Sequence, residues 1–197
     1  AKLAVCDGGK NCPSAKFSDV DPAKWYHEAV DFAVVNGLFA GTSATTFSPD
    51  DSMTRAMLVT VLWRLAGQPE AKTAASFRDV DAGQYYAKAV AWAAENGIVT
   101  GTGADTFEPD AEVTREQMAA ILYRYAAYWE LDVSAEADLS AYEDASSVSA
   151  YAQAAMQWAV ANGVINGTSA TTLEPAGTAT RAQAATVLVR FQNSMKS

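Results

Sequence analysis

Short motifs recur three times, in the same order, along this chain. Asn-Gly stands at residues 36–37, 96–97 and 162–163, and Thr-Arg stands at residues 54–55, 114–115 and 180–181. Between them lie Phe-Ser-Pro at 47–49, Phe-Glu-Pro at 107–109 and Leu-Glu-Pro at 173–175. Successive copies are offset by 60 and then by 66 residues. Self-similarity of this length is typical of repeat proteins, in which one small unit cannot bury its apolar face alone.

This register divides the chain into a tail and three repeats. The repeats cover residues 17–67, 77–127 and 142–191, and a tail of residues 1–16 precedes them. A short linker at residues 67–76 joins the first two repeats. The acidic stretch at residues 130–140 accounts for most of the longer second offset, and we interpret it as a second linker.

Each repeat has the pattern of a helix, a loop and a second helix. Tyr26, Val30 and Ala33 are apolar at helical spacing, which predicts a first helix from about Trp25 to Asn36. Gly37 should end that helix, because glycine readily takes the left-handed conformation of a helix terminus. The second helix is predicted to start at Thr54. Its apolar stripe comprises Met57, Leu58, Val61, Leu62 and Leu65, then Met118, Ile121, Leu122 and Tyr125, and finally Ala184, Val187, Leu188 and Phe191.

These patterns predict an all-α fold with six main helices, two in each repeat. Three helix-loop-helix repeats can close into a bundle around a pseudo-threefold axis, or they can stack as an open solenoid. We expect closure, because there are only three copies and none of them has the polar face of a capping repeat.

The starts of the second helices contain a residue that helix electrostatics disfavour. Thr54, Thr114 and Thr180 are good N-cap residues, and Gln117 and Gln183 complete capping boxes, whereas Met57 cannot. Arg55, Arg115 and Arg181 follow, although a cation there opposes the helix dipole at a cost of about 0.3–1 kcal/mol. Each arginine can join the free N–H groups of the helix start in an anion site. Alternatively, each can pair with an acid such as Asp19, Asp79 or Asp144 and link neighbouring repeats. The two roles can coexist.

Two sets of aromatic residues also follow the register. Trp25, Tyr85 and Tyr151 stand twelve residues before the glycine that ends each first helix. Such residues can stack on a sugar face, or they can simply pack between repeats. Phe32, Trp92 and Trp158 lie in the middle of the first helices, and we expect them in the core.

The charge balance excludes several classes of partner. The formal net charge is −9 and the isoelectric point is about 4.5. These values argue against nucleic acid as a partner, since neutralising phosphates requires a basic face. Anionic membranes are disfavoured for the same reason, and no stretch reaches the roughly 18 apolar residues of a membrane span. An acidic ligand could bind only where a few cations are gathered locally.

No catalytic arrangement stands out, so the chain is predicted not to be an enzyme. A Ser–His–Asp or Cys–His arrangement would have to use His27, the only histidine, and its sequence neighbours provide no nucleophile. We expect His27 to be solvated on the polar side of the first helix. Most of the 23 acidic residues fall at caps, turns and linkers. Walker-type, dinucleotide and calcium-loop motifs do not occur.

The only two cysteines, Cys6 and Cys12, lie in a Gly-rich segment with five residues between them. Two cysteines without a nearby histidine make a poor zinc site, which needs four ligands. No metal and no cofactor are therefore predicted. We favour a disulfide between the two, because an oxidising location would preserve it. Two free thiols in a flexible tail are the alternative.

The ordered motifs resemble the S-layer homology domain over about residues 17 to 191. The resemblance rests on Phe-x-Asp, the aromatic residue of the first helix, Asn-Gly, Phe-x-Pro and Thr-Arg-x-x. It implies a three-pronged, all-helical pseudo-trimer that anchors exported proteins non-covalently on Gram-positive-type cell walls. In many members the ligand is a secondary wall polymer with pyruvate ketals, and grooves between repeats hold its carboxylate.

Carried over by position, the resemblance places the three arginines at the basic residue of the family's Thr-Arg-Ala-Glu motif. It places Trp25, Tyr85 and Tyr151 at the groove aromatic. This sequence departs from that motif at Met57, Gln117 and Gln183, where the family has Glu. The third repeat is the least regular, so its groove and Arg181 are expected to contribute least. The candidate glycan-binding residues are Arg55, Arg115, Arg181, Trp25, Tyr85, Tyr151, Asp19 and Asp79.

The expected function is therefore that of a non-catalytic anchoring module at the cell surface. Its partner would be an acidic wall polysaccharide, and a larger exported protein would be its cargo. The alternative is a protein–protein or self-assembly module in which the arginines serve only as internal links.

Overall fold

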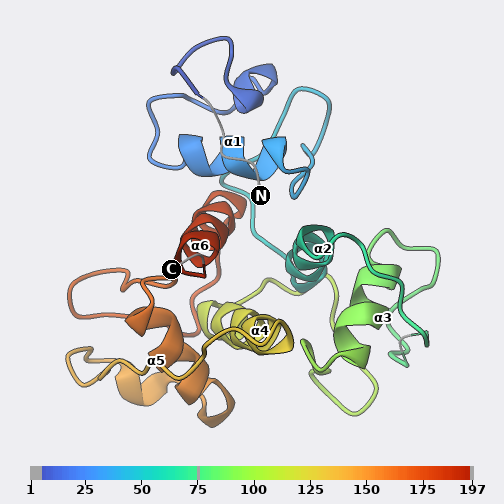
Figure 1. Cartoon of the computed structure of the whole chain (residues 1–197), viewed down its shortest axis with the longest axis vertical. Coiled ribbons are helices and arrows are strands. Elements are labelled where there is room, and N and C mark those ends of the chain that lie inside the picture. Colours follow the sequence, from blue (N-terminus) through green and yellow to red (C-terminus); the bar gives the residue numbers. More distant parts are fainter. Residues whose placement is uncertain (1–5, 75, 196–197) are drawn as a thin grey trace.

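The computed structural model describes residues 6–74 and 76–195, and the described chain is all-α. Three central helices are α2 (Arg55–Leu65), α4 (Arg115–Tyr128) and α6 (Arg181–Ser194). Three outer helices are α1 (His27–Val35), α3 (Ala87–Glu95) and α5 (Gln153–Ala161). Short 3-10 helices are η1 (Pro13–Lys16), η2 (Ala145–Ser147) and η3 (Ala150–Ala152). The predicted two main helices per repeat are confirmed (Figure 1).

The helix boundaries follow the local signals in the sequence. Gly37, Gly97 and Gly163 have φ angles of +65°, +68° and +64°, so each takes the predicted left-handed conformation after an outer helix. Thr114 and Thr180 form complete capping boxes, whereas Thr54 only accepts a hydrogen bond from the Met57 amide, as predicted. The first helix starts at His27, two residues later than predicted, because a turn occupies the residues before it.

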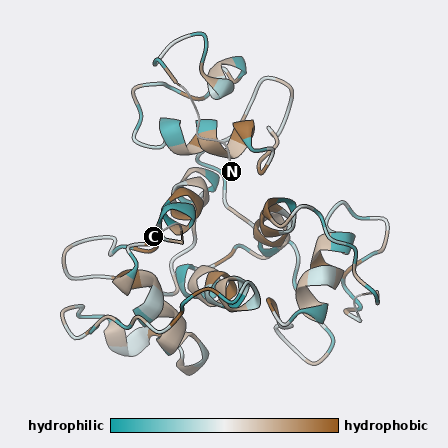
Figure 2. Cartoon of the chain, in the orientation of Figure 1, coloured by the Kyte–Doolittle hydropathy of each residue, from teal (hydrophilic) through white to brown (hydrophobic). Residues whose placement is uncertain are grey.

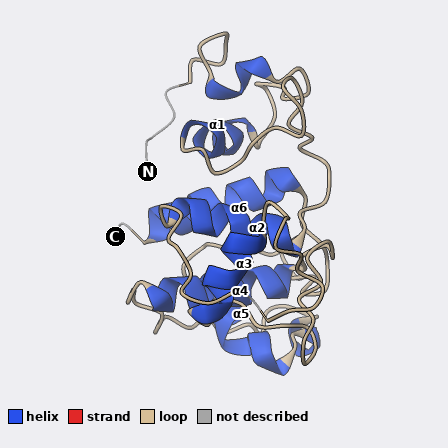
Figure 3. Ribbon diagram, turned by 90° about the vertical axis from the view of Figure 1, so that its right-hand side faces the viewer, coloured by secondary structure: helices blue, strands red, loops and turns tan. Residues whose placement is uncertain are grey.

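The outer helices pack against central helices of a different repeat. Helix α3 contacts α2, α5 contacts α4, and α1 contacts α6. In Figure 1, α2, α4 and α6 gather at the centre and the outer helices project as three arms. Figure 3 shows the same helices from the side. Each arm therefore depends on its neighbour for burial, and the first repeat completes its core on the last helix of the chain.

A cycle of backbone hydrogen bonds joins the segments that lead into the central helices. The Met53 amide donates to the Ala179 carbonyl at 2.8 Å, and the Ala179 amide donates to the Val113 carbonyl at 3.3 Å. The Val113 amide donates back to the Met53 carbonyl at 2.8 Å. All three repeats are linked in this cycle, so the alternative of an open stack with the first and third repeats apart is wrong.

The core is continuous across the repeats. Phe32, Trp92 and Trp158 are all buried, as predicted for residues in the middle of the outer helices. Phe191 of α6 contacts both Trp158 and Tyr125 through ring edges, with centroid distances of 6.2 and 5.8 Å. Such contacts stabilise a pair of aromatic residues beyond the area they bury. Figure 2 shows apolar residues on the central helices, while the outer loops are largely hydrophilic.

Candidate functional site

The three arginines at the starts of the central helices link neighbouring repeats. The Nε atom of Arg55 donates to the Phe107 carbonyl at 2.9 Å, that of Arg115 to the Leu173 carbonyl at 2.7 Å, and that of Arg181 to the Phe47 carbonyl at 3.0 Å. Their Nη2 atoms donate to the carbonyls of Thr100, Asn166 and Ala40. Each arginine therefore binds the loop of the next repeat, and Arg181 binds the first repeat.

Burial and stacking accompany these hydrogen bonds. Arg55 and Arg181 are only 5% and 6% exposed. The guanidinium of Arg55 lies 4.7 Å from the centre of the Phe107 ring, and that of Arg181 lies 4.8 Å from the centre of the Phe47 ring. Desolvation lowers the pKa of Arg55, Arg115 and Arg181. Carbonyl oxygens thus replace part of the water around all three cations, and ring faces do so around Arg55 and Arg181.

The free N–H groups predicted for an anion site are occupied. The Arg55 amide donates to the Ala111 carbonyl at 2.9 Å, and the next amide, of Ala56, donates to the Pro109 carbonyl at 3.0 Å. The third amide of the helix is bound by the cap residue Thr54. The same pattern recurs at the starts of α4 and α6. The prediction of helix-start donors for a ligand was wrong, because the turn of the next repeat supplies their acceptors.

The acidic residues of the first motif also bind backbone rather than arginine. The two carboxylate oxygens of Asp19 accept from the amides of Phe47 and Ser48 at 2.8 and 2.7 Å. Asp79 and Asp144 bind the equivalent amides of their own repeats. No ion pair joins them to the three arginines within the described residues, so the predicted Arg–Asp pairing was wrong. Asp19 holds the amide of Phe47 while Arg181 holds its carbonyl, which fixes the turn from both sides.

Two hollows lie between the repeats, and each has an arginine of this set in its wall. One, of about 460 Å³, is lined by Arg55 of the first repeat, Thr100 and Arg124 of the second, and Tyr151 of the third. The other, of about 260 Å³, brings together Arg181, Arg64 and Tyr85. Below, these are called the Arg55 groove and the Arg181 groove.

The predicted aromatic residues are solvent-exposed. Tyr85 and Tyr151 line the two grooves and are 58% and 54% exposed. Trp25 is 65% exposed and borders a separate hollow next to Cys6 and Lys24. The structure therefore places two of the three aromatic residues beside an arginine from a different repeat. Asp19 and Asp79 line neither groove.

A second set of arginines escaped the sequence interpretation. Arg64, Arg124 and Arg190 occupy the same position in α2, α4 and α6, and they recur at the offsets of 60 and 66 residues. Arg64 and Arg124 line the two grooves, and Arg64 also donates to the Leu38 carbonyl at 3.0 Å. Desolvation lowers the pKa of Arg115, Glu174 opposes this shift, and the positive charge of Arg190 adds to it. The repeat register contained this signal, and aligning the helices over their full length would have revealed it.

Both grooves contain a residue of the irregular third repeat, Tyr151 in one and Arg181 in the other. The Arg181 groove has its loop from the first repeat and its aromatic residue from the second, so both are regular. Tyr151, from the third repeat, lines the Arg55 groove. Outside the groove lining, Glu116 accepts hydrogen bonds from the Ser149 amide and hydroxyl at 2.8 and 2.7 Å. The expectation that Arg181 contributes least to binding stays a prediction.

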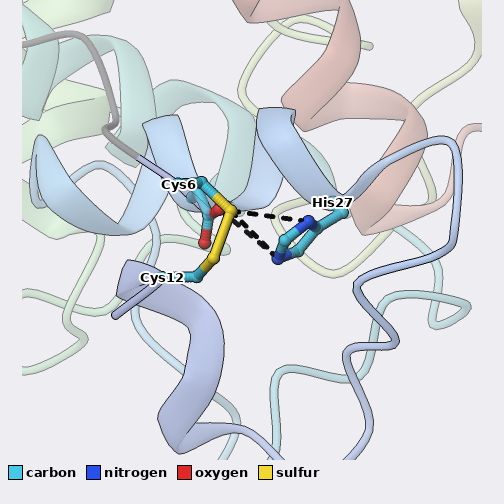
Figure 4. A group of neighbouring side chains, drawn as sticks. Cys6, Cys12 and His27 are labelled. Atoms are coloured by element: carbon cyan, nitrogen blue, oxygen red, sulfur yellow. Dashed lines mark hydrogen bonds and ion pairs between the residues drawn. A yellow bond between two sulfur atoms is a disulfide. The ribbon is translucent and has the colours of Figure 1, made fainter. Parts of the chain in front are cut away.

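The tail brings a further group of polar side chains together. Cys6 and Cys12 are joined by a disulfide, and Cys6 Sγ lies 3.8 Å from both ring nitrogens of His27 (Figure 4). The prediction that His27 is solvated was wrong: the residue is 6% exposed, and its Nε2 lies 3.4 Å from a carboxylate oxygen of Asp31. Folding of the tail over α1 also places a histidine near the cysteines, which removes the reason given above for discounting zinc.

Comparison with known proteins identifies the family. Residues 16–56, 76–119 and 141–185 match the S-layer homology domain. The chain belongs to this family. It is 37% identical over 172 residues to an endoglucanase of Bacillus sp. (strain KSM-635), a match covering 87% of this chain and 18% of the relative. It is 35% identical over 181 residues to the surface-layer 125 kDa protein of Lysinibacillus sphaericus, covering 90% of this chain and 15% of that protein.

A further relative is the exoglucanase XynX of Acetivibrio thermocellus, 30% identical over 177 residues, with 89% of this chain and 16% of the relative covered. The chain thus spans less than a fifth of the length of these relatives. Among the described residues, no helix has the length and apolar character needed to cross a membrane.

Proposed function

We propose that this S-layer homology module anchors a larger exported protein at the cell surface by binding an acidic wall polysaccharide. The observation that supports this most directly is the make-up of the grooves. Each of the two combines a pair of arginines with an exposed tyrosine, in a protein whose net charge is −9. A strongly acidic protein can hold an anionic ligand only where cations are concentrated in this way.

In the Arg55 groove, the two arginines have different tasks. Arg55 uses Nε and Nη2 to hold the second repeat, and its Nη1 makes no hydrogen bond within the described residues. Arg124 lies across the groove and has no ion-pair partner there. A carboxylate such as that of a pyruvate ketal can therefore accept from Nη1 of Arg55 and from the planar fork of Arg124.

The tyrosine completes the site for a sugar. Tyr151 stands at the same groove, and Glu116 accepts a hydrogen bond from its hydroxyl at 3.5 Å. An aromatic face held in this way provides an apolar surface for a pyranose ring while the arginines hold the charged substituent. The Arg181 groove repeats the arrangement with Arg64 and Tyr85. By the same cyclic order, Arg115 would combine with Arg190 and Trp25.

The surface-layer protein among the relatives supports a second candidate, a self-assembly module without a glycan ligand. In that case the arginines at the helix starts would serve only as links between repeats, which their contacts with carbonyl oxygens already explain. The groove arginine Arg124 distinguishes the two functions, because it does not join the repeats through any of these hydrogen bonds.

The decisive experiment is a titration of the protein with purified wall polymer, before and after mild acid removal of pyruvate. Arg124→Ala should weaken binding about 10- to 150-fold, which corresponds to the 1.5–3 kcal/mol of a charged hydrogen bond. Arg78→Ala is the matched control, because Arg78 is exposed, lies in the same repeat and, within the described part of the chain, forms an ion pair only with the exposed Asp105. Removal of pyruvate from the polymer should weaken its binding to the parent protein by a similar factor.

Unchanged affinity of Arg124→Ala for a polymer that the parent binds would contradict the carboxylate site. Absence of any polymer binding, together with concentration-dependent association in sedimentation, would favour the self-assembly function. Circular dichroism of each variant verifies that the helices are intact.

A further inference from the structure

Four side chains that commonly bind metal ions converge where the tail packs on α1. They are Cys6 and Cys12 of the tail and His27 of the helix, which are labelled in Figure 4, together with Asp31 of the same helix. Their ligand atoms all lie within 4.8 Å of one another. His27 and Asp31 are four residues apart, so one face of the helix presents both. The 3-10 helix η1, which starts directly after Cys12, packs against α1 and keeps the tail in place.

Two of the separations are close to those around a tetrahedral ion. Cys6 Sγ lies 3.8 Å from the ring nitrogens of His27, and His27 Nε2 lies 3.4 Å from Asp31 Oδ2. Zinc bonds of about 2.0–2.3 Å place the corners of a tetrahedron about 3.3–3.8 Å apart. The two sulfur atoms alone do not fit, because the disulfide joins them. Breaking that bond would let them move apart, since Gly8 and Gly9 lie in the intervening loop.

Asp31 provides a second indication that the cluster can take an ion. Its side chain is fully buried, and Oδ2 accepts no hydrogen bond within the described residues, although it lies 3.4 Å from Nε2 of His27, another member of the cluster. A buried polar atom without a partner is uncommon in native proteins. The other oxygen, Oδ1, accepts from the Ser14 amide at 2.8 Å, which fixes the orientation of the carboxylate. Hydrogen bonds of this kind behind the ligands are typical of metal sites.

We propose that the reduced form of this cluster binds one Zn²⁺ through Cys6, Cys12, His27 and Asp31, and that the disulfide and the metal are alternative states of one site. A dithiol reductant transfers two electrons and two protons to the disulfide, which yields two thiols and the oxidised, cyclic form of the reductant. Zn²⁺ then displaces the two thiol protons into solvent and binds two thiolates, a neutral imidazole and a carboxylate.

All four coordination positions would come from the protein, so the site is structural rather than catalytic. In either state the cluster attaches the tail to α1, by a covalent bond or by the ion. The cluster lines neither the Arg55 groove nor the Arg181 groove, so this inference does not depend on the proposed glycan binding.

The test uses Co²⁺ as a spectroscopic probe and the whole chain, reduced without oxygen by a phosphine. We expect the reduced protein to bind one equivalent of Co²⁺ with the charge-transfer absorption of thiolate ligands and the visible bands of four-coordination. Zn²⁺ should then displace the Co²⁺. The disulfide form, prepared in parallel, should show neither absorption.

Three variants test the ligands. Co²⁺ binding should weaken at least about tenfold in each of His27→Gln, Asp31→Asn and Cys6→Ser. Even the loss of a residue that only hydrogen-bonds to a metal ligand has an effect of this size. Glu28→Gln is the matched control, because Glu28 is exposed on the same helix and adjacent to His27. Asp31→Asn keeps an acceptor for the Ser14 amide. If a helix variant fails to fold by circular dichroism, Cys6→Ser alters only the tail and provides the test. A reduced parent without the charge-transfer absorption, or ligand variants that bind Co²⁺ as tightly as the parent, would overturn the proposal.

Discussion

Removal of the Arg181 side chain tests whether the three repeats are closed by these arginines. Arg181→Ala deletes the hydrogen bonds to the carbonyls of Phe47 and Ala40, which join the third repeat to the first. Hydrogen bonds to a charged group contribute about 1.5–3 kcal/mol each, and stacking on the Phe47 ring adds about 0.5–2 kcal/mol. Truncation also removes the cost of burying the Arg181 charge, the same desolvation that lowers its pKa, and this offsets part of the loss. We therefore expect a loss of about 3–5 kcal/mol in the free energy of unfolding.

The assay is urea denaturation followed by far-ultraviolet circular dichroism. Arg78→Ala is the control, because the side chains of Arg78 and Asp105 are 73% and 56% exposed and such a pair contributes less than about 1 kcal/mol. Arg181→Lys should recover part of the loss, since an ammonium group lacks the planar fork that reaches two carbonyls. A loss of less than about 1 kcal/mol for Arg181→Ala would refute the reasoning, because the links would then contribute no more than surface pairs.

Two further predictions concern the loops that the arginines bind. A Cβ at Gly101 would lie 2.5 Å from the Thr106 carbonyl oxygen and 2.8 Å from that of Gly103. Gly101→Ala should therefore lower the free energy of unfolding by about 1–3 kcal/mol in the same assay. Gly83→Ala should not, because a Cβ there approaches only the Asp81 side chain. The pKa of Asp144 is lowered from 3.8, chiefly because its carboxylate accepts a hydrogen bond from the Leu173 amide. Burial opposes this shift, and a hydrogen bond from the Glu174 amide adds to it. Asp144 therefore stabilises the fold above pH 3.8 and loses this effect as the pH falls through the lower folded pKa. In Asp144→Asn, the free energy of unfolding should depend less on pH in this acidic range. An unchanged pH dependence would contradict this.

Local signals predicted the elements of the fold because helix ends depend on nearby residues. The left-handed Gly37 and the capping box of Thr114 are set by residues within a few positions in the sequence. The pairing of α1 with α6 was beyond such signals. An apolar stripe indicates that a helix is buried, but it does not specify which other helix covers it.

The candidate site was predicted in part, and the failures have a common cause. The dipole argument correctly drew attention to Arg55, but it treated the helix start as isolated. In the fold, carbonyl oxygens of the second repeat surround that start and accept both its amides and its guanidinium. His27 was misjudged for the same reason, since the tail that covers it occurs only once and has no periodic signal.

The geometry couples the two roles that the sequence left open for the arginines. Each groove takes its walls from three repeats, as with Arg55, Arg124 and Tyr151. The groove therefore exists only when the repeats are closed, and Arg55 would both close them through Nε and Nη2 and offer Nη1 to the proposed ligand. A bound carboxylate would add a charged contact to the same guanidinium, so ligand binding and closure should stabilise each other. A single repeat has one wall of a groove at most, so the proposed binding through these grooves would require three copies rather than one.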